Sequence, residues 1–564
     1  MNNSRTYYSM IESLPNMISP VIEIFAVSVP TSHTQTNDHT PAPPVNVGHL
    51  ASCITSPNRF HVKNAPRRLW ASLKNRVSLD HTIFAFISLA TLAFVTIMNR
   101  NTSFWLDEMY TLGIASRHTL ASALAPGMAL SDPIPPLHMI LLWIWIRILN
   151  PFRPFDSVWL ILPSVVAIGI AIFITGLIAR RVVGPGPASW IACLLCATSA
   201  NWIRVGAQVR YFGLLFMVSA IVIYLFVRLR NGSPEKSSWA LRIAFGVAMA
   251  LAVMTGYSSV FWLVGLFLID VFWIIRRKLS PKEFYSYAIG AILCLPWAYL
   301  VVHTILSGSG VHTLAEIWAP TPTLSLALSP YASMTTSLPI YLLYLFSIFL
   351  LIVTIAVSPA TRNTTKASLN VCFILSPAIM LALLYIYSKL PVVNGSLMVT
   401  RYSYQVWPML CVTVAQAIAI VLQTWGASRK TLRGLVILSI VFVCTVQQAT
   451  SFVADMQGKP HYNISQPYAS GTAFLSKRPD INNTSTVVYM SANDLPLSGW
   501  RYFYVTAQGT RPGFKVTNMI PSDANLVYVF YPTSNSWTPS AAFTAHYTMV
   551  DQYQDVHVDV YKKS

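Results

Sequence analysis

Long apolar segments alternate with short polar ones from about residue 81 to residue 450. Most of these segments have roughly 15 to 23 apolar residues, which is close to the length that a helix needs to cross the hydrocarbon core of a bilayer. The pattern predicts twelve helical segments, near 82–98, 136–149, 157–179, 188–203, 211–227, 240–256, 260–275, 286–305, 335–357, 368–388, 404–424 and 433–450.

The two ends of the chain have a different pattern. Residues 1–80 are polar and rich in Pro, Ser, Thr and Asn, and they lack the form of a signal peptide, so we expect a largely disordered cytoplasmic extension. Residues 451–564 are rich in Asn, Ser, Asp and aromatic residues and contain short strand-like runs. We therefore expect three parts: the extension, a membrane domain over 81–450, and a small mixed α/β domain outside the membrane over 451–564.

Composition agrees with a membrane protein. The chain is 54% hydrophobic and only 10% charged, and its mean hydropathy is +0.53. These values exclude an ordinary soluble surface and predict an α-helical polytopic membrane protein. The formal charge of +19 is spread over short basic clusters between apolar segments. Such clusters mark cytoplasmic loops under the positive-inside rule, so we expect no nucleic-acid partner.

The basic clusters predict the topology, except for one stretch. Counted backward from Arg180-Arg181, Arg276-Arg277-Lys278 and Arg429-Lys430, the C-terminal part and the region of Arg401 lie outside. Counted forward from a cytoplasmic N-terminus, Asp107 lies outside as well. The two counts disagree in parity between residues 99 and 157. Either the segment 136–149 does not cross, or another short crossing lies in the loop, or one cluster breaks the rule, which leaves 11 to 13 transmembrane helices.

An acidic pair, Asp107-Glu108, follows the first apolar segment. Only eight acidic residues occur between 81 and 454, so two adjacent ones are unusual. Trp105 and Tyr110 flank the pair and favour the headgroup level of a membrane. A carboxylate there could act as general base on the hydroxyl of a membrane-bound substrate, although a solvated loop would also explain the pair.

His138 and two groups of basic and aromatic residues are the other polar candidates. His138 comes directly after a proline-rich turn and could bind phosphate or tune the carboxylates, or it could simply be a packed or capping histidine. Arg204, Arg210 and Tyr211 form one group. Both arginines fall on the outer side by the backward count, against the positive-inside trend.

Arg401 and Tyr402 form the second group, again on the outer side at the start of a long apolar segment. An outward arginine beside apolar helices suits the phosphate of a lipid, because its guanidinium can make two parallel hydrogen bonds to phosphate oxygens. An arginine at the end of a span can also merely extend its head toward water.

Several motifs in the same order resemble the membrane glycosyltransferases of the GT-C fold. The resemblance is to the branch of protein O-mannosyltransferases, aminoarabinose transferases and rhizobial lipopolysaccharide galacturonosyltransferases, and it covers roughly residues 100–430. It rests on Asp107-Glu108, Pro135-Pro136-Leu137, Arg210-Tyr211, Tyr257-Ser258-Ser259, Leu295-Pro296-Trp297, Ile317-Trp318-Ala319-Pro320-Thr321-Pro322-Thr323 and Arg401-Tyr402. One departure is that Asp132-Pro133-Ile134 replaces the histidine that usually precedes the double proline.

The resemblance implies transfer of a sugar from a polyprenyl-phosphate donor to a hydroxyl of a lipid or protein acceptor, with inversion. Asp107 would be the general base, and Glu108 would orient the acceptor or stabilise the loop. Arg210 and Arg401 would hold the donor phosphate. The further expected substrate-binding residues are Arg204, Tyr211, His138 and Tyr402. The resemblance implies no metal and no other cofactor, and the nearest relatives suggest a bacterial inner membrane with a periplasmic active site.

A transporter or lipid flippase is the main alternative, since it also buries a few charges among many helices. It should show internal repeats or charges at mid-membrane depth, whereas here the charges gather at the ends of the apolar segments. A polysaccharide polymerase or ligase is a second alternative. Such an enzyme would need large outer loops, and the loop at 306–334 is modest.

Overall fold

The computed structural model describes residues 79–100, 103–129, 135–153, 156–231, 239–276, 279–306, 323, 338–357, 365–390, 397–424, 434, 439–440, 442–443, 446, 450, 468–490, 494–507, 515–517, 519–531 and 539–564. By its contacts the chain divides into residues 1–78 and Leu79–Ser564, and all described residues belong to the second unit. The expected disorder of residues 1–80 therefore falls almost wholly outside the described residues.

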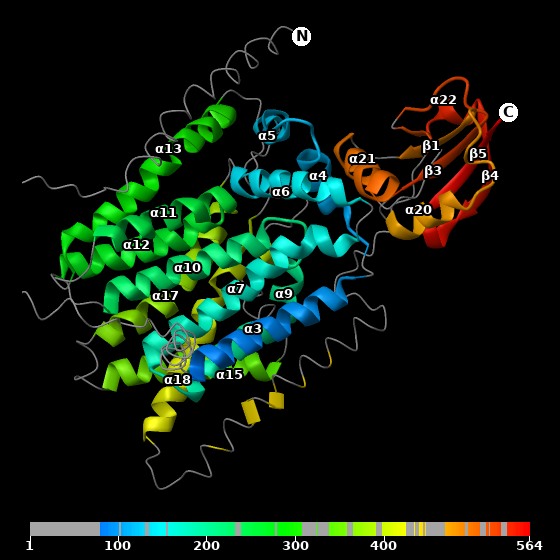
Figure 1. The fold of residues 1–564 in the computed structure, drawn as a ribbon. Helices are drawn as coiled ribbons and strands as arrows, with labels where there is room; N and C mark the ends of the chain where they lie inside the picture. The colour runs from blue at the N-terminus through cyan, green and yellow to red at the C-terminus, as the bar shows by residue number, and fades with distance from the viewer. Residues whose placement is uncertain are drawn as a thin grey trace, which may run out of the picture. The chain divides into compact units, whose positions relative to one another are not determined.

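Helices follow one another through the first part of this unit (Figure 1). They are α3 (Leu79–Met98), α4 (Leu106–Ala115), α5 (Leu120–Ala129), α6 (Pro136–Leu149), α7 (Ser157–Val183), α8 (Pro187–Thr198), α9 (Ala200–Gly206), α10 (Phe212–Asn231), α11 (Trp239–Thr255), α12 (Ser259–Ile275), α13 (Phe284–Leu306), α15 (Leu338–Val357), α17 (Thr365–Tyr387) and α18 (Trp407–Thr424). The predicted segments up to 404–424 each fall on a helix. One of them, 188–203, is divided at Ser199, where the backbone is extended. Segment 433–450 lies largely outside the described residues.

Five stretches among the described residues are long and apolar enough to cross a membrane by themselves: Leu79–Met98, Ser157–Val183, Phe212–Asn231, Leu369–Tyr387 and Thr400–Leu422. Further apolar helices are shorter, for example Trp239–Thr255 and Ser259–Ile275. A helix of 17 residues is still about 26 Å long, which is close to the thickness of the hydrocarbon core. The chain is thus an α-helical polytopic membrane protein, as its composition predicts.

Helices α3 and α7 are antiparallel neighbours. Asp80, at the start of α3, accepts hydrogen bonds from Arg180 Nε at the end of α7 (2.8 Å) and from the indole of Trp190 on α8 (2.7 Å). The start of α3, the end of α7 and the start of α8 therefore meet at one end of the helices. Because the positive-inside rule assigns Arg180 to the cytoplasm, we call this the inner end and the opposite one the outer end.

Four more helix ends meet through buried ion pairs, which we call the inner ion cluster. Arg230, at the end of α10, pairs with Asp270 near the end of α12. Glu283, just before α13, pairs with Arg230 (3.3 Å) and with Arg242 at the start of α11 (3.0 Å). All four side chains are at most 8% exposed. The cluster shows that α10, α11, α12 and α13 alternate in direction.

Helix α6 accompanies only the first turns of α7. The indole of Trp145 donates to the carbonyl oxygen of Trp159 (2.7 Å), and His138 lines one cavity with Pro163 and Ser164. From Asp80 to Arg180 the chain therefore crosses on α3 and returns on α7, while α6 stays near the outer end. Among the described residues, this arrangement agrees with the first alternative for the parity conflict, in which the segment 136–149 does not cross.

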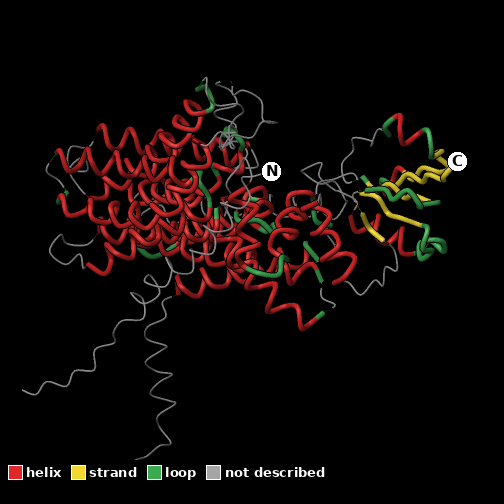
Figure 2. Tube along the Cα trace, turned by 90° about the horizontal axis from the view of Figure 1, so that it is seen from above, coloured by secondary structure: helices red, strands yellow, loops and turns green. Residues whose placement is uncertain are grey.

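The C-terminal part contains a sheet, whose strands are yellow in Figure 2. Strands β1 (Thr486–Met490), β2 (Lys515–Thr517), β3 (Leu526–Phe530), β4 (Tyr547–Tyr553) and β5 (Val558–Lys563) are arranged in the order β2-β1-β3-β5-β4. The first three are parallel, and β5 and β4 are antiparallel to their neighbours. Helices α20 (Tyr468–Ser476) and α21 (Asp494–Trp500) precede and follow β1. This is the expected small α/β domain.

Candidate active site at the outer end

The acidic pair lies in the first turn of α4. Trp105 is the N-cap residue, and the Glu108 side chain reaches back so that its Oε2 accepts from the Trp105 backbone N–H (3.1 Å). An acidic side chain at the third helical position that accepts from the N-cap backbone N–H forms one half of a capping box and is typical of a helix start. Negative charge is also favoured there by the helix dipole. The local sequence thus fixes the start of α4. Glu108 is buried there, and Asp107 lies next to it in the same turn.

Glu108 connects α4 to the turn before α10. Its Oε1 accepts from the backbone N–H of Val209 (2.7 Å), directly before Arg210. Burial raises the pKa of the Glu108 carboxyl to about 7, although the two N–H donors and the charge of Arg210 oppose the shift. Both Glu108 oxygens are occupied by backbone donors. The side chain therefore holds two segments together.

Close packing of α10 against α7 and α9 places Arg210. At Gly213, in the first turn of α10, an added Cβ would lie 2.5 Å from the carbonyl oxygen of Gly206 and 2.8 Å from that of Ser164. Only glycine fits this approach without moving backbone. The short turn between α9 and α10 is consequently held against α7 with Arg210 at the outer end.

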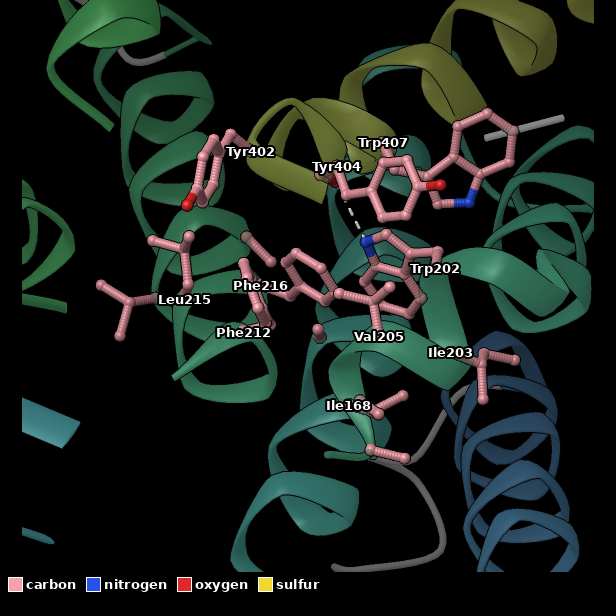
Figure 3. Packing of buried hydrophobic residues seen from close by; sticks show 14 of the residues in the cluster. Ile168, Trp202, Ile203, Val205, Phe212, Leu215, Phe216, Tyr402, Tyr404 and Trp407 are labelled. Atoms are coloured by element: carbon pink, nitrogen blue, oxygen red, sulfur yellow. Dashed lines mark hydrogen bonds between the residues drawn. The ribbon is translucent and has the colours of Figure 1, made fainter. Parts of the chain in front are cut away.

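Arg401 is on a short 3-10 helix, Thr400–Tyr402, that precedes α18. The indole of Trp202 on α9 donates to the carbonyl oxygen of Tyr404 (3.0 Å), as the dashed line in Figure 3 shows. The amide nitrogen of Gln405 donates to Tyr402 O (3.0 Å) and Ser258 Oγ (3.1 Å), and the Gln405 oxygen accepts from Ser259 (2.9 Å). These buried bonds fix the segment that carries Arg401.

Three charged side chains meet at this point, which we call the outer site. Asp107 Oδ2 lies 3.0 Å from Arg210 Nη1 and 3.9 Å from Arg401 Nη2. Asp107 is 30% exposed, and the two arginines are 16% and 15% exposed. Two guanidinium groups face one carboxylate, so the set carries a net charge of +1. A partly exposed site with excess positive charge is suited to an anion such as phosphate.

Aromatic rings enclose the two guanidinium groups. The Cζ of Arg210 lies 6.0 Å from the ring centres of both Trp105 and Phe212, and that of Arg401 lies 5.8 Å and 5.9 Å from them. Phe212 belongs to the buried aromatic group of Figure 3 together with Phe216 and Trp202. The rings limit access of water and strengthen electrostatic interactions inside the site.

The other predicted residues differ in how close they lie to the outer site. Tyr211 and Tyr402 each lie beside their neighbouring arginine, with ring centres 5.8 Å and 5.6 Å from the guanidinium carbons. Arg204 is partly buried on α9 and takes part in neither ion pair of Asp107.

His138 is buried at the start of α6 and lines a cavity with Val209 and mainly apolar residues of α6, α7 and α10. Its Nε2 has no hydrogen-bond partner among the described residues. The imidazole is thus next to the segment that carries Arg210.

Two of the other motifs also meet, while a third cannot be placed. The indole of Trp297 on α13 donates to the hydroxyl of Tyr257, and Ser258 and Ser259 contact Gln405. Residues Ile317 to Pro322 and Asp132 lie outside the described residues. Gln405, Trp202 and Phe212 were not predicted as part of the site. Their only signal in the sequence is proximity to a predicted arginine: Trp202 is two positions from Arg204, Phe212 two from Arg210 and Gln405 four from Arg401.

No protein-family model matches the sequence, and no curated protein matches it. Among solved structures, ArnT from Cupriavidus metallidurans bound to undecaprenyl phosphate superposes with a TM-score of 0.55, at 13% identity, over 85% of this chain and 97% of that chain. The apo structure of the same protein gives 0.53, at 13% identity, over 88% and 98%. At this identity the likeness shows the fold alone. The chain has the GT-C fold, as its motifs predicted.

Proposed function

We propose that this protein is an integral-membrane glycosyltransferase, which transfers a sugar from a polyprenyl-phosphate donor to a hydroxyl group on a glycolipid, lipopolysaccharide or protein. The observation that carries this proposal is the outer site. There Asp107 lies within 3.9 Å of both Arg210 and Arg401, at the end of the helices opposite the inner ion cluster. A fold shared with ArnT, which was crystallised with undecaprenyl phosphate, supports the choice of donor.

Arg210 and Arg401 bind the donor phosphate in this proposal. The phosphodiester of the donor has one negative charge, which matches the net +1 of the outer site. A second negative charge develops on the leaving oxygen as its bond to the sugar breaks. Two enclosed guanidinium groups stabilise that charge more in the transition state than in the bound donor, which is the condition for catalysis.

Asp107 acts as the general base. The acceptor oxygen forms a bond to the anomeric carbon while the bond from that carbon to the phosphate oxygen breaks, and the acceptor proton moves to Asp107. The products are the glycoside, with inverted anomeric configuration, and polyprenyl phosphate. Asp107 is suited to this role because its carboxylate is 30% exposed and can reach an acceptor, and because the two arginines that bind the donor lie within 3.9 Å of it.

The remaining residues have supporting roles. We assign Glu108 to holding the loop, because both of its oxygens accept backbone hydrogen bonds. Tyr211 and Tyr402 shield the arginines and border the substrate. His138 offers an unpaired nitrogen next to the segment of Arg210, and Arg204 adds a positive charge in the last turn of α9. The basic clusters at the inner end favour a site facing the periplasm of a bacterium.

Sugar transfer in a reconstituted system tests the proposal. Purified protein in envelope-lipid vesicles is supplied with tritiated polyprenyl-phosphate sugars, one each of hexose, uronic acid and pentose type, and label reaching lipid or protein acceptors is counted. We expect transfer by the wild type and a loss of about 10²- to 10⁴-fold in Asp107→Asn, the range for a general base. The matched control is Asp156→Asn, at the exposed N-cap of α7. Full activity of Asp107→Asn would remove Asp107 as the base.

A further inference from the structure

The C-terminal domain contacts the segment that carries the acidic pair. The hydroxyl of Tyr504, in the helical turn Arg501–Ala507, accepts a hydrogen bond from the backbone N–H of Phe104 (3.0 Å) and lies 3.3 Å from Ser103 Oγ. The Tyr504 ring also packs edge-on against the Phe104 ring. This anchor is buried and lies three residues before Asp107.

A second anchor lies on the far side of the pair, where α21 packs on α4. An added Cβ at Gly499 would lie 1.9 Å from the carbonyl oxygen of Met109 and 3.0 Å from the backbone nitrogen of Gly113. The two helices therefore touch through their backbones. Because the atoms in the way are backbone atoms, a side chain at Gly499 could be accommodated only if α4 and α21 move apart.

Helix α20 adds to the first anchor. The backbone N–H of Ala469 donates to Ser103 Oγ (3.3 Å), and the ring of Tyr468 stacks on that of Tyr504 at 6.3 Å. Burial raises the pKa of the Tyr468 hydroxyl above its ordinary range, and neighbouring Tyr504 and Asp107 raise it further. Tyr468 is thus close enough to Asp107 to be affected by its charge.

We propose that Tyr504 and Gly499 are positioning residues, through which the C-terminal domain fixes α4 on both sides of Asp107 and so sets the position of the general base. This rests on the proposed function. The outer site then depends on two parts of the chain. The membrane helices supply the arginines, and the C-terminal domain aligns the carboxylate of Asp107.

The distances make such control effective. Proton transfer needs the base within about 2.6–3.2 Å of the acceptor hydroxyl, and a displacement of about 1 Å can cost about 10²-fold in rate. Arg210 and Arg401 are held by other contacts, namely the packing of Gly213 and the bonds of Gln405. Loosening the anchors should therefore affect the chemical step more than donor binding.

Tyr504→Phe is the sharpest variant, because it keeps the ring and removes only the hydroxyl. We expect kcat to fall by about 10- to 100-fold while the KM for the donor stays within about threefold. The matched control is Tyr528→Phe, which removes a hydroxyl bonded to Arg478 and Asp480 inside the same domain. Activity of Tyr504→Phe near the wild-type value would overturn the proposal, and so would an equal loss in the control, since that would indicate a general weakening of the domain.

Hydrogen–deuterium exchange provides a readout that does not depend on sugar transfer. We expect faster exchange over residues 103–115 in Tyr504→Phe and in Gly499→Ala, and no change there in Tyr528→Phe. Gly169→Ala is the control for the glycine variant, because its added Cβ would make an ordinary 3.5 Å contact with Leu92. Unchanged exchange over residues 103–115 in Tyr504→Phe would overturn the proposal that the C-terminal domain anchors α4. If the wild type transfers no sugar, the proposed function fails, and exchange still decides whether the domain anchors α4.

Discussion

The two ends of the helical domain use the same residue types in opposite ways. The inner ion cluster has two arginines, Arg230 and Arg242, and two acids, Asp270 and Glu283, and all are buried. The outer site has two arginines that face a single, partly exposed carboxylate, that of Asp107, at distances of 3.0 Å and 3.9 Å. The inner cluster is therefore neutral in itself, whereas the outer site carries one positive charge and is open to solvent.

The difference separates a structural ion cluster from a candidate active site. Buried charges must be paired, and in the inner ion cluster two acids balance two arginines, so no excess charge is left to attract an ionic ligand. In a partly exposed site with an excess positive charge, an arginine can pair with an anionic substrate in addition to the carboxylate of the site. The variants below test whether the two clusters differ in this way.

Removing both outer arginines should have the largest effect. We expect Arg210→Ala with Arg401→Ala to lower kcat/KM by about 10⁴-fold, which is about 5.5 kcal/mol, because each donor to a developing charge is worth about 10²- to 10³-fold. Transfer from tritiated polyprenyl-phosphate donor measures the loss, and thermal unfolding in detergent checks the fold. Arg228→Ala is the control, since this exposed arginine lies near the end of α10 away from the outer site. A double variant that keeps wild-type activity would disprove the phosphate assignment.

Removing a single inner arginine should affect stability instead. We expect Arg230→Met to destabilise the protein by about 3–5 kcal/mol, because Asp270 would remain buried without its cation. Activity per folded molecule should stay near the wild-type value. Chemical denaturation in micelles gives the first quantity, and transfer normalised to folded protein gives the second. A loss of activity without a loss of stability would mean that the inner ion cluster contributes to function.

The positions of the helices were predictable from the sequence, but which of them cross the membrane was only partly predictable. Periodic apolar runs end at charges or prolines, so segments such as 157–179 and 211–227 fall on α7 and α10. The sequence could not show that 136–149 stays at the outer end. Its composition is that of a span, and only its contacts with the first turns of α7, at Trp159 and beside Ser164, reveal how far it reaches.

Site residues were predictable where local chemistry marks them. Asp107, Arg210 and Arg401 are charges at the outer ends of apolar segments, and the structure brings these three together. Tyr504 was not predictable, because it lies 400 positions from Phe104 in the sequence and in a domain with many other tyrosines. Contacts over such a separation depend on tertiary packing and leave no local pattern.

Glu108 predicts a pH dependence of stability. The folded protein holds the Glu108 proton up to a pKa of about 7, whereas the unfolded chain loses it near the ordinary value of 4.5. The folded state therefore binds more protons in this window, and stability falls as pH rises from about 4.5 to 7, by about 3 kcal/mol. Thermal unfolding of the wild type between pH 4 and 8 measures it. Glu108→Gln cannot ionise and should remove this fall. An identical pH dependence in both proteins would contradict the assignment.

Removing an inner pair as a unit should have the smallest effect. In the triple variant Arg230→Met, Asp270→Leu and Tyr287→Phe, the paired charges Arg230 and Asp270 are removed together, and so is the Tyr287 hydroxyl that donates to Asp270. Glu283 loses its contact with Arg230 but is still neutralised by Arg242. Replacing a buried ion pair by apolar side chains of similar volume is often neutral, so we expect stability within about 1 kcal/mol of the wild type and unchanged transfer. Loss of transfer in a stable triple variant would contradict the contrast between the two clusters, since a neutral structural cluster should be replaceable.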